Sequence, residues 1–178
     1  MGTISLSNTN SKHLRVQGGA LINLGSEVSE AVLPLQGMYA ASKHAVKGFT
    51  DALRVEVEEI DRAPVSITLI QPTAVNTPFP QHARNYMDRE PKLPTPQIDP
   101  MDVAEAILKA ATDGGRDVKV GAMSVGNVMM NRVMPGMADK ASAKQADRQQ
   151  HELPPLAPEG TLYRPGGRGE QRGDATLH

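Results

Sequence analysis

Short apolar runs alternate along the chain with longer segments in which apolar residues recur at helical spacing. The apolar runs at 20–24 and 65–70 are too short for helices and predict strands, the first of them a buried parallel strand. The segment 117–121 predicts a third short strand. Helical spacing covers residues 37–61 and 99–112. Strands that alternate with helices in this way predict an α/β domain built on a parallel sheet.

The segment 37–61 has the longest helical pattern. Lys47, Asp51, Arg54 and Glu58 occupy much of one side of this helix. Most positions on the apolar side are interpreted as core, and the alanines among them permit the close approach of another backbone. The apolar positions are Ala41, Ala45, Phe49, Ala52, Leu53, Val57 and Ile60.

Local signals mark both ends of the helix over 99–112. Asp99 is a capping residue, Pro100 suits the first turn, and Gly114 with Gly115 stops the helix. Further on, residues 122–134 are rich in methionine. They predict another apolar helix whose flexible side chains fill gaps in the core.

Two other segments lack a regular pattern. Residues 12–19 are interpreted as the end of a helix that turns at a pair of glycines. The segment 72–100 holds seven of the fourteen prolines. So long a stretch with little regular structure is typical of a functional loop, and only its middle part, 80–88, predicts a short helix.

The composition excludes several classes of function. The 178 residues suffice for one domain with a core, and the net charge of −1 indicates neither a nucleic-acid nor a membrane partner. Cysteine is absent and the five histidines are scattered, so we expect no disulfide and no metal site. No apolar run approaches the roughly 20 residues that span a bilayer. Residues 1–11 lack the pattern of a signal peptide, which predicts a cytoplasmic location.

Three polar residues near the first strand form a candidate catalytic site. Ser26 follows the strand 20–24, at the carboxyl edge of the sheet where ligands bind. Tyr39 and Lys43 are four positions apart on the long helix and share one face. A cation next to a phenol stabilises the phenolate, so the pair can exchange a proton with a substrate oxygen that Ser26 also binds. The alternative is an exposed Tyr/Lys pair on an amphipathic helix.

The stretch Tyr39-Ala-Ala-Ser-Lys43, with Ser26 upstream, closely resembles the short-chain dehydrogenase/reductase family. In that family the matching tyrosine is the general acid/base, the lysine holds the cofactor ribose and favours the tyrosinate, and the serine binds the substrate oxygen. The resemblance implies a partial Rossmann-like, doubly wound parallel sheet of about three strands with flanking helices. It also implies an NAD(P)-dependent oxidoreductase that interconverts a small alcohol and a carbonyl compound, with a homo-oligomer formed through the helix 37–61.

Residues 71–78 resemble the family's Pro-Gly-x-Val-x-Thr segment, which lies along the nicotinamide end of the cofactor. Thr73 takes the place of the usual glycine, a departure that removes some backbone freedom. The loop 72–100 corresponds to the family's substrate-covering loop. The resemblance implies cofactor contacts, with NAD or NADP, from Leu24, Tyr39, Lys43, Pro72, Thr73, Val75 and Thr77. The candidate substrate contacts are Gln36, Phe79 and Tyr86.

The resemblance covers residues 12–135, which correspond to the C-terminal half of a family member. Residues 1–11 are unmatched, and 136–178 form a polar tail, rich in proline and glycine, that we expect to be largely disordered after residue 152. The glycine-rich cofactor unit of the family would lie in an N-terminal half that is missing here. We therefore expect the strand 20–24 to have an open edge, which is a pairing hazard.

Two hypotheses follow. The first is an oxidoreductase of this family. The second is a catalytically inactive truncated fragment that at most binds a related subunit through the helix 37–61. In either case we expect the 178 residues alone to bind the cofactor poorly, because the pyrophosphate needs a glycine-rich turn and a helix N-terminus.

Overall fold

A three-stranded parallel sheet forms the centre of the molecule. The computed structural model describes residues 18–161, 163 and 171–173. The sheet has the order β1-β2-β3, with both neighbouring pairs parallel, which confirms the predicted α/β architecture. The strands are β1 (Gly19–Leu24), β2 (Val65–Pro72) and β3 (Asp117–Val120).

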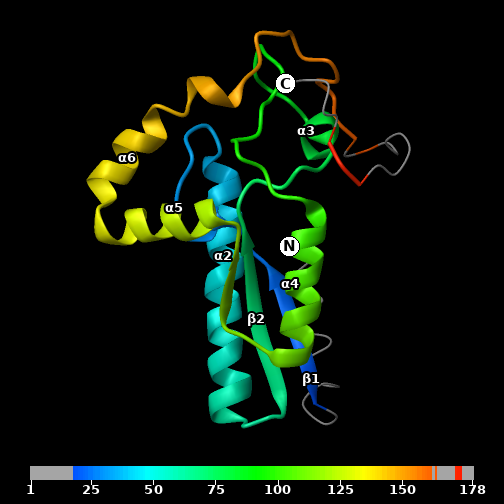
Figure 1. Ribbon diagram of the computed structural model, residues 1–178, viewed down its shortest axis with the longest axis vertical. Helices are drawn as coiled ribbons and strands as arrows, with labels where there is room; N and C mark the ends of the chain where they lie inside the picture. The colour runs from blue at the N-terminus through cyan, green and yellow to red at the C-terminus, as the bar shows by residue number, and fades with distance from the viewer. Residues whose placement is uncertain (1–17, 162, 164–170, 174–178) are drawn as a thin grey trace.

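Helices α2 and α4 flank this sheet (Figure 1). Asn23 of β1 donates a hydrogen bond of 2.9 Å to Thr50 of α2, whereas Thr68 of β2 donates one of 2.8 Å to the carbonyl of Gly115, just beyond α4. The two helices thus cover opposite faces. The helical elements are η1 (Glu27–Ser29), α2 (Gly37–Arg54), η2 (Val55–Ile60), α3 (Phe79–His82), α4 (Pro100–Asp113), α5 (Ala122–Val133), α6 (Pro135–Ala143) and η3 (Asp147–Gln149).

The hydrophobic core lies between α2 and its continuation η2 on one side and the sheet on the other. Ile67 at the centre of β2 is 1 % exposed, and Val57 of η2 is equally buried. Burial of a side chain of this size contributes about 1.5–3 kcal/mol. The cluster consists of Leu21, Leu53, Val57, Val65 and Ile67, with Phe49 and Ala63 packed against it.

The helix predicted over 37–61 is confirmed, with two differences. Its last turn, η2, is a π-helix, in which the amide of Asp61 bonds to the carbonyl of Glu56 at 2.9 Å. The interpretation of the apolar side as mostly core is wrong. Ala41, Ala45, Ala52 and Ile60 are exposed, because the described strands cover only the face that carries the core cluster.

The signals at the ends of α4 act as expected. Asp99 accepts a hydrogen bond from the amide of Met101 at 2.9 Å, and Asp102 accepts one from the amide of Asp99 at 3.2 Å. Gly114 ends the helix with a φ of 71°, a conformation that favours glycine. The α4 helix therefore begins and ends where the sequence predicts.

Residues 147–161 run beside the loop 82–92, as the orange and green segments of Figure 1 show. Backbone hydrogen bonds of 2.8 Å join His151 to Glu90, Glu90 to Leu153, and Thr161 to His82. Beyond η3, this part of the tail contains no helix or strand among its described residues. That the tail is largely disordered after residue 152 stays a prediction.

Among the described strands, β1 lies at one edge of the sheet and pairs only with β2. None of the helices in the described part is both long and apolar enough to cross a membrane. The predicted helix end at 12–17 lies outside the described residues.

Candidate functional site

Ser26 is placed by a short turn at the end of β1. It is 9 % exposed and caps η1, with its Oγ accepting a hydrogen bond from the amide of Val28 at 3.3 Å. Its own amide donates to the hydroxyl of Ser29 at 3.1 Å. A hydroxyl oxygen that accepts such a bond still has its proton to donate, so the Ser26 hydroxyl keeps a donor at the carboxyl edge of the sheet.

Tyr39 and Lys43 lie in the first turns of α2, above the same edge. The Lys43 Nζ lies 5.8 Å from the centre of the Tyr39 ring, and it donates a hydrogen bond of 3.1 Å to the carbonyl of Leu24. Partial burial lowers the pKa of Lys43 below its ordinary value. The Tyr39 side chain is 40 % exposed. The pair therefore faces open space beside the end of β1.

The segment after β2 lies at the same end of the sheet. The amide of Thr73 donates a hydrogen bond of 3.0 Å to the carbonyl of Val120, and that of Thr77 donates one of 2.8 Å to the carbonyl of Val75. Val75 also forms a β-bridge with Ile98. Pro72 is the last residue of β2, so the predicted contacts of this segment lie at the end of the strand or directly after it.

Thr73 occupies the position of a family glycine, and Gly121 makes room for it. A Cβ on Gly121 would lie 2.6 Å from the Cγ2 atom of Thr73, a distance that real Cβ contacts do not show. Gly121 also has a φ of 92°, which disfavours other residues. The larger side chain of Thr73 thus fits only because Gly121 has no side chain.

The three candidate substrate residues lie apart from the described cavities. Phe79 and Tyr86 are 62 % and 81 % exposed, and the side-chain amide of Gln36 bonds to Gln149 at 2.7 Å. None of the three lines either described pocket. Their role as substrate contacts stays a prediction.

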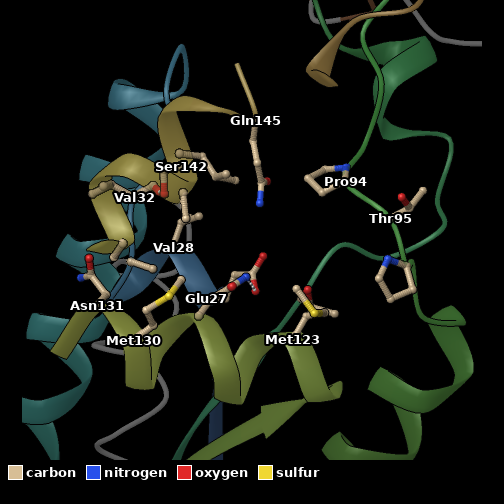
Figure 2. A pocket seen from close by; sticks show the side chains of 17 residues that line it. Glu27, Val28, Val32, Pro94, Thr95, Met123, Met130, Asn131, Ser142 and Gln145 are labelled. Carbon is tan, nitrogen blue, oxygen red and sulfur yellow. Dashed lines mark hydrogen bonds between the residues drawn. The ribbon is translucent and has the colours of Figure 1, made fainter. Parts of the chain in front are cut away.

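A cavity that the sequence did not predict lies beside Glu27, the residue after Ser26. Glu27 forms part of its floor, and Gln145 reaches toward it from the opposite side (Figure 2). A carboxyl group directly after Ser26 was the available signal. The cavity is lined by Glu27, Val28, Ala31, Val32, Leu33, Thr73, Pro94, Thr95, Pro96, Met123, Asn127, Met130, Asn131, Ala138, Ala141, Ser142 and Gln145.

A second glutamate anchors the floor of this cavity to the rest of the fold. Glu30 accepts hydrogen bonds from Lys119 of β3 and Gln71 of β2, each at 3.0 Å, and from Arg132 of α5. Burial acts to raise the pKa of Glu30, but these hydrogen bonds, with the charge of Lys119, lower it overall. The loop after β1 is thereby fixed to two strands and a helix.

Glu27 itself has a different environment. Its Oε2 atom accepts a hydrogen bond from Asn127 of α5 at 3.0 Å, and Thr73 hydrogen-bonds the same carboxyl group. Burial raises the pKa of Glu27 despite these bonds. No group of three or more potential metal-ligating side chains is found in the described part of the chain.

Comparisons with known proteins agree with the motifs around Tyr39. The family model described as short chain dehydrogenase matches residues 1–88. A Bacillus subtilis protein named "uncharacterized oxidoreductase YxnA" is 38 % identical over 157 residues, which cover 85 % of this chain and 44 % of the relative. The chain belongs to the short-chain dehydrogenase/reductase family. The family match begins at residue 1, whereas the resemblance described above begins at residue 12.

Other members of the short-chain dehydrogenase/reductase family match over similar lengths. A Danio rerio protein, dehydrogenase/reductase SDR family member 7B, is 27 % identical over 139 residues, which cover 74 % of this chain and 43 % of the relative. A Burkholderia cenocepacia short chain dehydrogenase, solved in complex with NADP, superposes with a TM-score of 0.65 at 24 % identity, over 79 % of this chain and 54 % of that one. The chain therefore spans less than half the length of these curated relatives, and the structural likeness confirms the fold.

Proposed function

We propose that the chain provides the catalytic residues of an NAD(P)-dependent oxidoreductase that interconverts an alcohol and a carbonyl compound. The observation that carries this proposal is the placement of Lys43. Its ammonium lies beside the Tyr39 ring and bonds to the last carbonyl of β1, two residues before Ser26. This places the cation, the phenol and the strand end at one edge of the sheet.

Each residue has a distinct role in the proposed reaction. Ser26 binds and orients the substrate oxygen, Tyr39 donates a proton to that oxygen or removes it, and Lys43 stabilises the phenolate form. The cofactor, when bound, supplies or accepts the hydride. A hydroxyl, a phenol and an ammonium at one edge are the donors that this proton transfer needs.

The described residues fit one end of such a cofactor. Leu24, Thr73, Val75 and Thr77, with Lys43, lie around the carboxyl ends of β1 and β2, where a nicotinamide and its ribose would bind. They offer no glycine-rich turn leading into a helix, which the pyrophosphate needs. The choice between NAD and NADP belongs to residues that this part of the fold does not include.

A non-catalytic binding role is the second candidate. One face of α2 carries exposed Ala41, Ala45, Gly48 and Ala52, and a Cβ on Gly48 would meet no atom within 4 Å. Small exposed side chains allow another helix to approach closely. This face supports the idea that the chain pairs with a related subunit, or with a second copy, through α2.

Cofactor binding and turnover separate the two candidates. The purified 178-residue chain is titrated with NADH and NADPH, and the cofactor fluorescence is followed. The chain is then joined to the N-terminal half of the Bacillus subtilis relative, and turnover of alcohols and carbonyl compounds is measured. We expect no saturable micromolar binding by the chain alone and turnover by the joined protein. A joined protein that binds NAD(P)H without turnover would favour the binding role.

A further inference from the structure

The cavity beside Ser26 contains a carboxyl group in an unusual position. Glu27 is only 6 % exposed, yet its carboxyl group forms part of the cavity floor. Asn127 and Thr73 hydrogen-bond to it from two different elements. The side chain is therefore held in place by neutral donors, and Figure 2 shows its oxygen atoms directed into the space below Gln145.

The two neighbouring glutamates differ in how their charge is balanced. Glu30 forms ion pairs with Lys119 and Arg132. No described lysine, arginine or histidine lines the cavity or forms an ion pair with Glu27. A buried carboxylate without a cationic partner is costly, so a cation that entered the cavity would give the Glu27 carboxylate the partner that the protein itself does not supply.

The rest of the cavity suits a small organic cation rather than a metal ion. Val28, Val32, Met123 and Met130 provide apolar surface on the walls. A bare divalent ion needs several oxygen ligands, whereas an alkylammonium needs hydrogen-bond acceptors at one end and apolar contact along its chain. The cavity volume is about 50 Å³, compared with the roughly 10–15 Å³ that one water needs. A short amine would fit.

The cavity and the proposed reaction site are formed in part by the same two segments, the turn after β1 and the segment after β2. Glu27 is the residue after Ser26, and Thr73, which lines the cavity, belongs to the predicted cofactor contacts. We propose that Glu27 binds a protonated amino group of the substrate, which makes the substrate class amino alcohols and the corresponding amino ketones or aldehydes. This inference rests on the proposed function for the reaction, but not for the binding of an ammonium group.

Binding is tested first, without cofactor or turnover. The 178-residue chain, labelled with ¹³C in its methionine methyl groups, is titrated with n-butylammonium and with 1-butanol. We expect the signals of Met123 and Met130 to shift and saturate with the amine at lower concentration than with the alcohol. The signals of Met38 and Met101, which are 87 % and 52 % exposed and line neither pocket, serve as internal controls.

A matched pair of variants connects this binding to one carboxyl group. Glu27→Gln keeps the shape of the side chain and should weaken the amine at least about tenfold, since hydrogen bonds to charged groups contribute about 1.5–3 kcal/mol. Glu59→Gln, which removes an exposed carboxylate on η2, should leave the affinity unchanged. Equal binding of amine and alcohol, equal affinity in both variants, or no shift of either cavity methionine would overturn the proposal.

Turnover then separates this inference from the proposed function. In the joined protein, amino alcohols should have a higher kcat/KM than alkanols of the same length, and Glu27→Gln should bring the ratio of the two kcat/KM values close to one. Turnover of alkanols without any preference would overturn the inference and leave the proposed function standing. Ammonium binding through Glu27 in a joined protein without turnover would support the binding site and overturn the proposed function.

Discussion

The Lys43 ammonium donates a hydrogen bond of 3.1 Å to the carbonyl oxygen of Leu24, the last residue of β1. This bond joins α2 to the end of the strand that leads into Ser26. It also explains how a lysine can be partly buried here, because a backbone carbonyl replaces some of the water that its charge loses. The geometry of the site and its stability are thus connected through one side chain.

The lowered pKa of Lys43 predicts how stability changes with pH. Because the folded state binds this proton less tightly than the unfolded state, the Lys43 contribution to stability increases as pH rises from the lowered folded value to the ordinary value of 10.5. The free energy of unfolding of the native chain, minus that of Lys43→Met, should therefore rise over this alkaline range. Urea unfolding at a series of pH values measures it. Lys109→Met, at an exposed position of α4, is the control, and a falling difference would contradict the assignment.

Replacing Tyr39 by phenylalanine should remove turnover in the joined protein while NAD(P)H binding remains. The change deletes the proton donor but leaves Lys43 in place, and a general acid/base typically contributes about 10²–10⁴-fold in rate. Steady-state kinetics and cofactor fluorescence measure the two effects. Tyr163→Phe, at a side chain that is 88 % exposed, should have native turnover. A Tyr39→Phe protein with near-native turnover would place the proton transfer on another group.

Gly121→Ala should destabilise the fold. The new methyl group would overlap with Thr73, and the positive φ of Gly121 adds strain of about 1–3 kcal/mol. Gly126→Ala is the matched control, since Gly126 lies inside α5 with no atom within 4 Å of a new Cβ. That change should stabilise by about 0.5–1 kcal/mol. Chemical denaturation compares the two, and equal effects would show that the contact with Thr73 is unimportant.

Glu90→Ala should release the segment 147–161 from the loop 82–92. Glu90 is 3 % exposed, and its carboxylate accepts a hydrogen bond from the amide of Leu156 at 2.8 Å. Its loss should cost about 1–3 kcal/mol and expose the segment to proteases. Limited proteolysis with mass spectrometry should find faster cleavage within 147–161. Glu159→Ala, at an exposed position in the same segment, should be cleaved at the native rate. Equal cleavage of Glu90→Ala and the native chain would show that Glu90 does not hold the segment.

Elements with local signals were predictable from the sequence. Asp99 marks the start of α4 through its capping side chain and Gly114 marks the end through its backbone conformation, and the β-branched run that forms β2 is bounded by Pro64. Tyr39 and Lys43 could be paired because both lie on one helix, so their relationship depends only on helical spacing. Predictions of this kind need no knowledge of the tertiary structure.

The cavity at Glu27 could not be predicted in the same way. Its walls come from the loop after β1, the loop around Pro94, and the helices α5 and α6, which are distant in the sequence. The pairing of Thr73 with Gly121 and the exposed side of α2 have the same origin, because each depends on what another segment covers. Periodicity identifies the apolar side of a helix but not the part of it that a neighbour buries.

The parallel order β1-β2-β3 also determines how the chain must fold. Parallel neighbours cannot be joined by a tight hairpin, so each strand pair forms only after a long crossover, through α2 for the first pair and α4 for the second, has brought distant residues together. Contacts of such high sequence separation cost loop-closure entropy before they contribute any stabilisation. Folding is therefore expected to be slow compared with that of a helical bundle of the same length. The apolar strands would remain unpaired for much of that time.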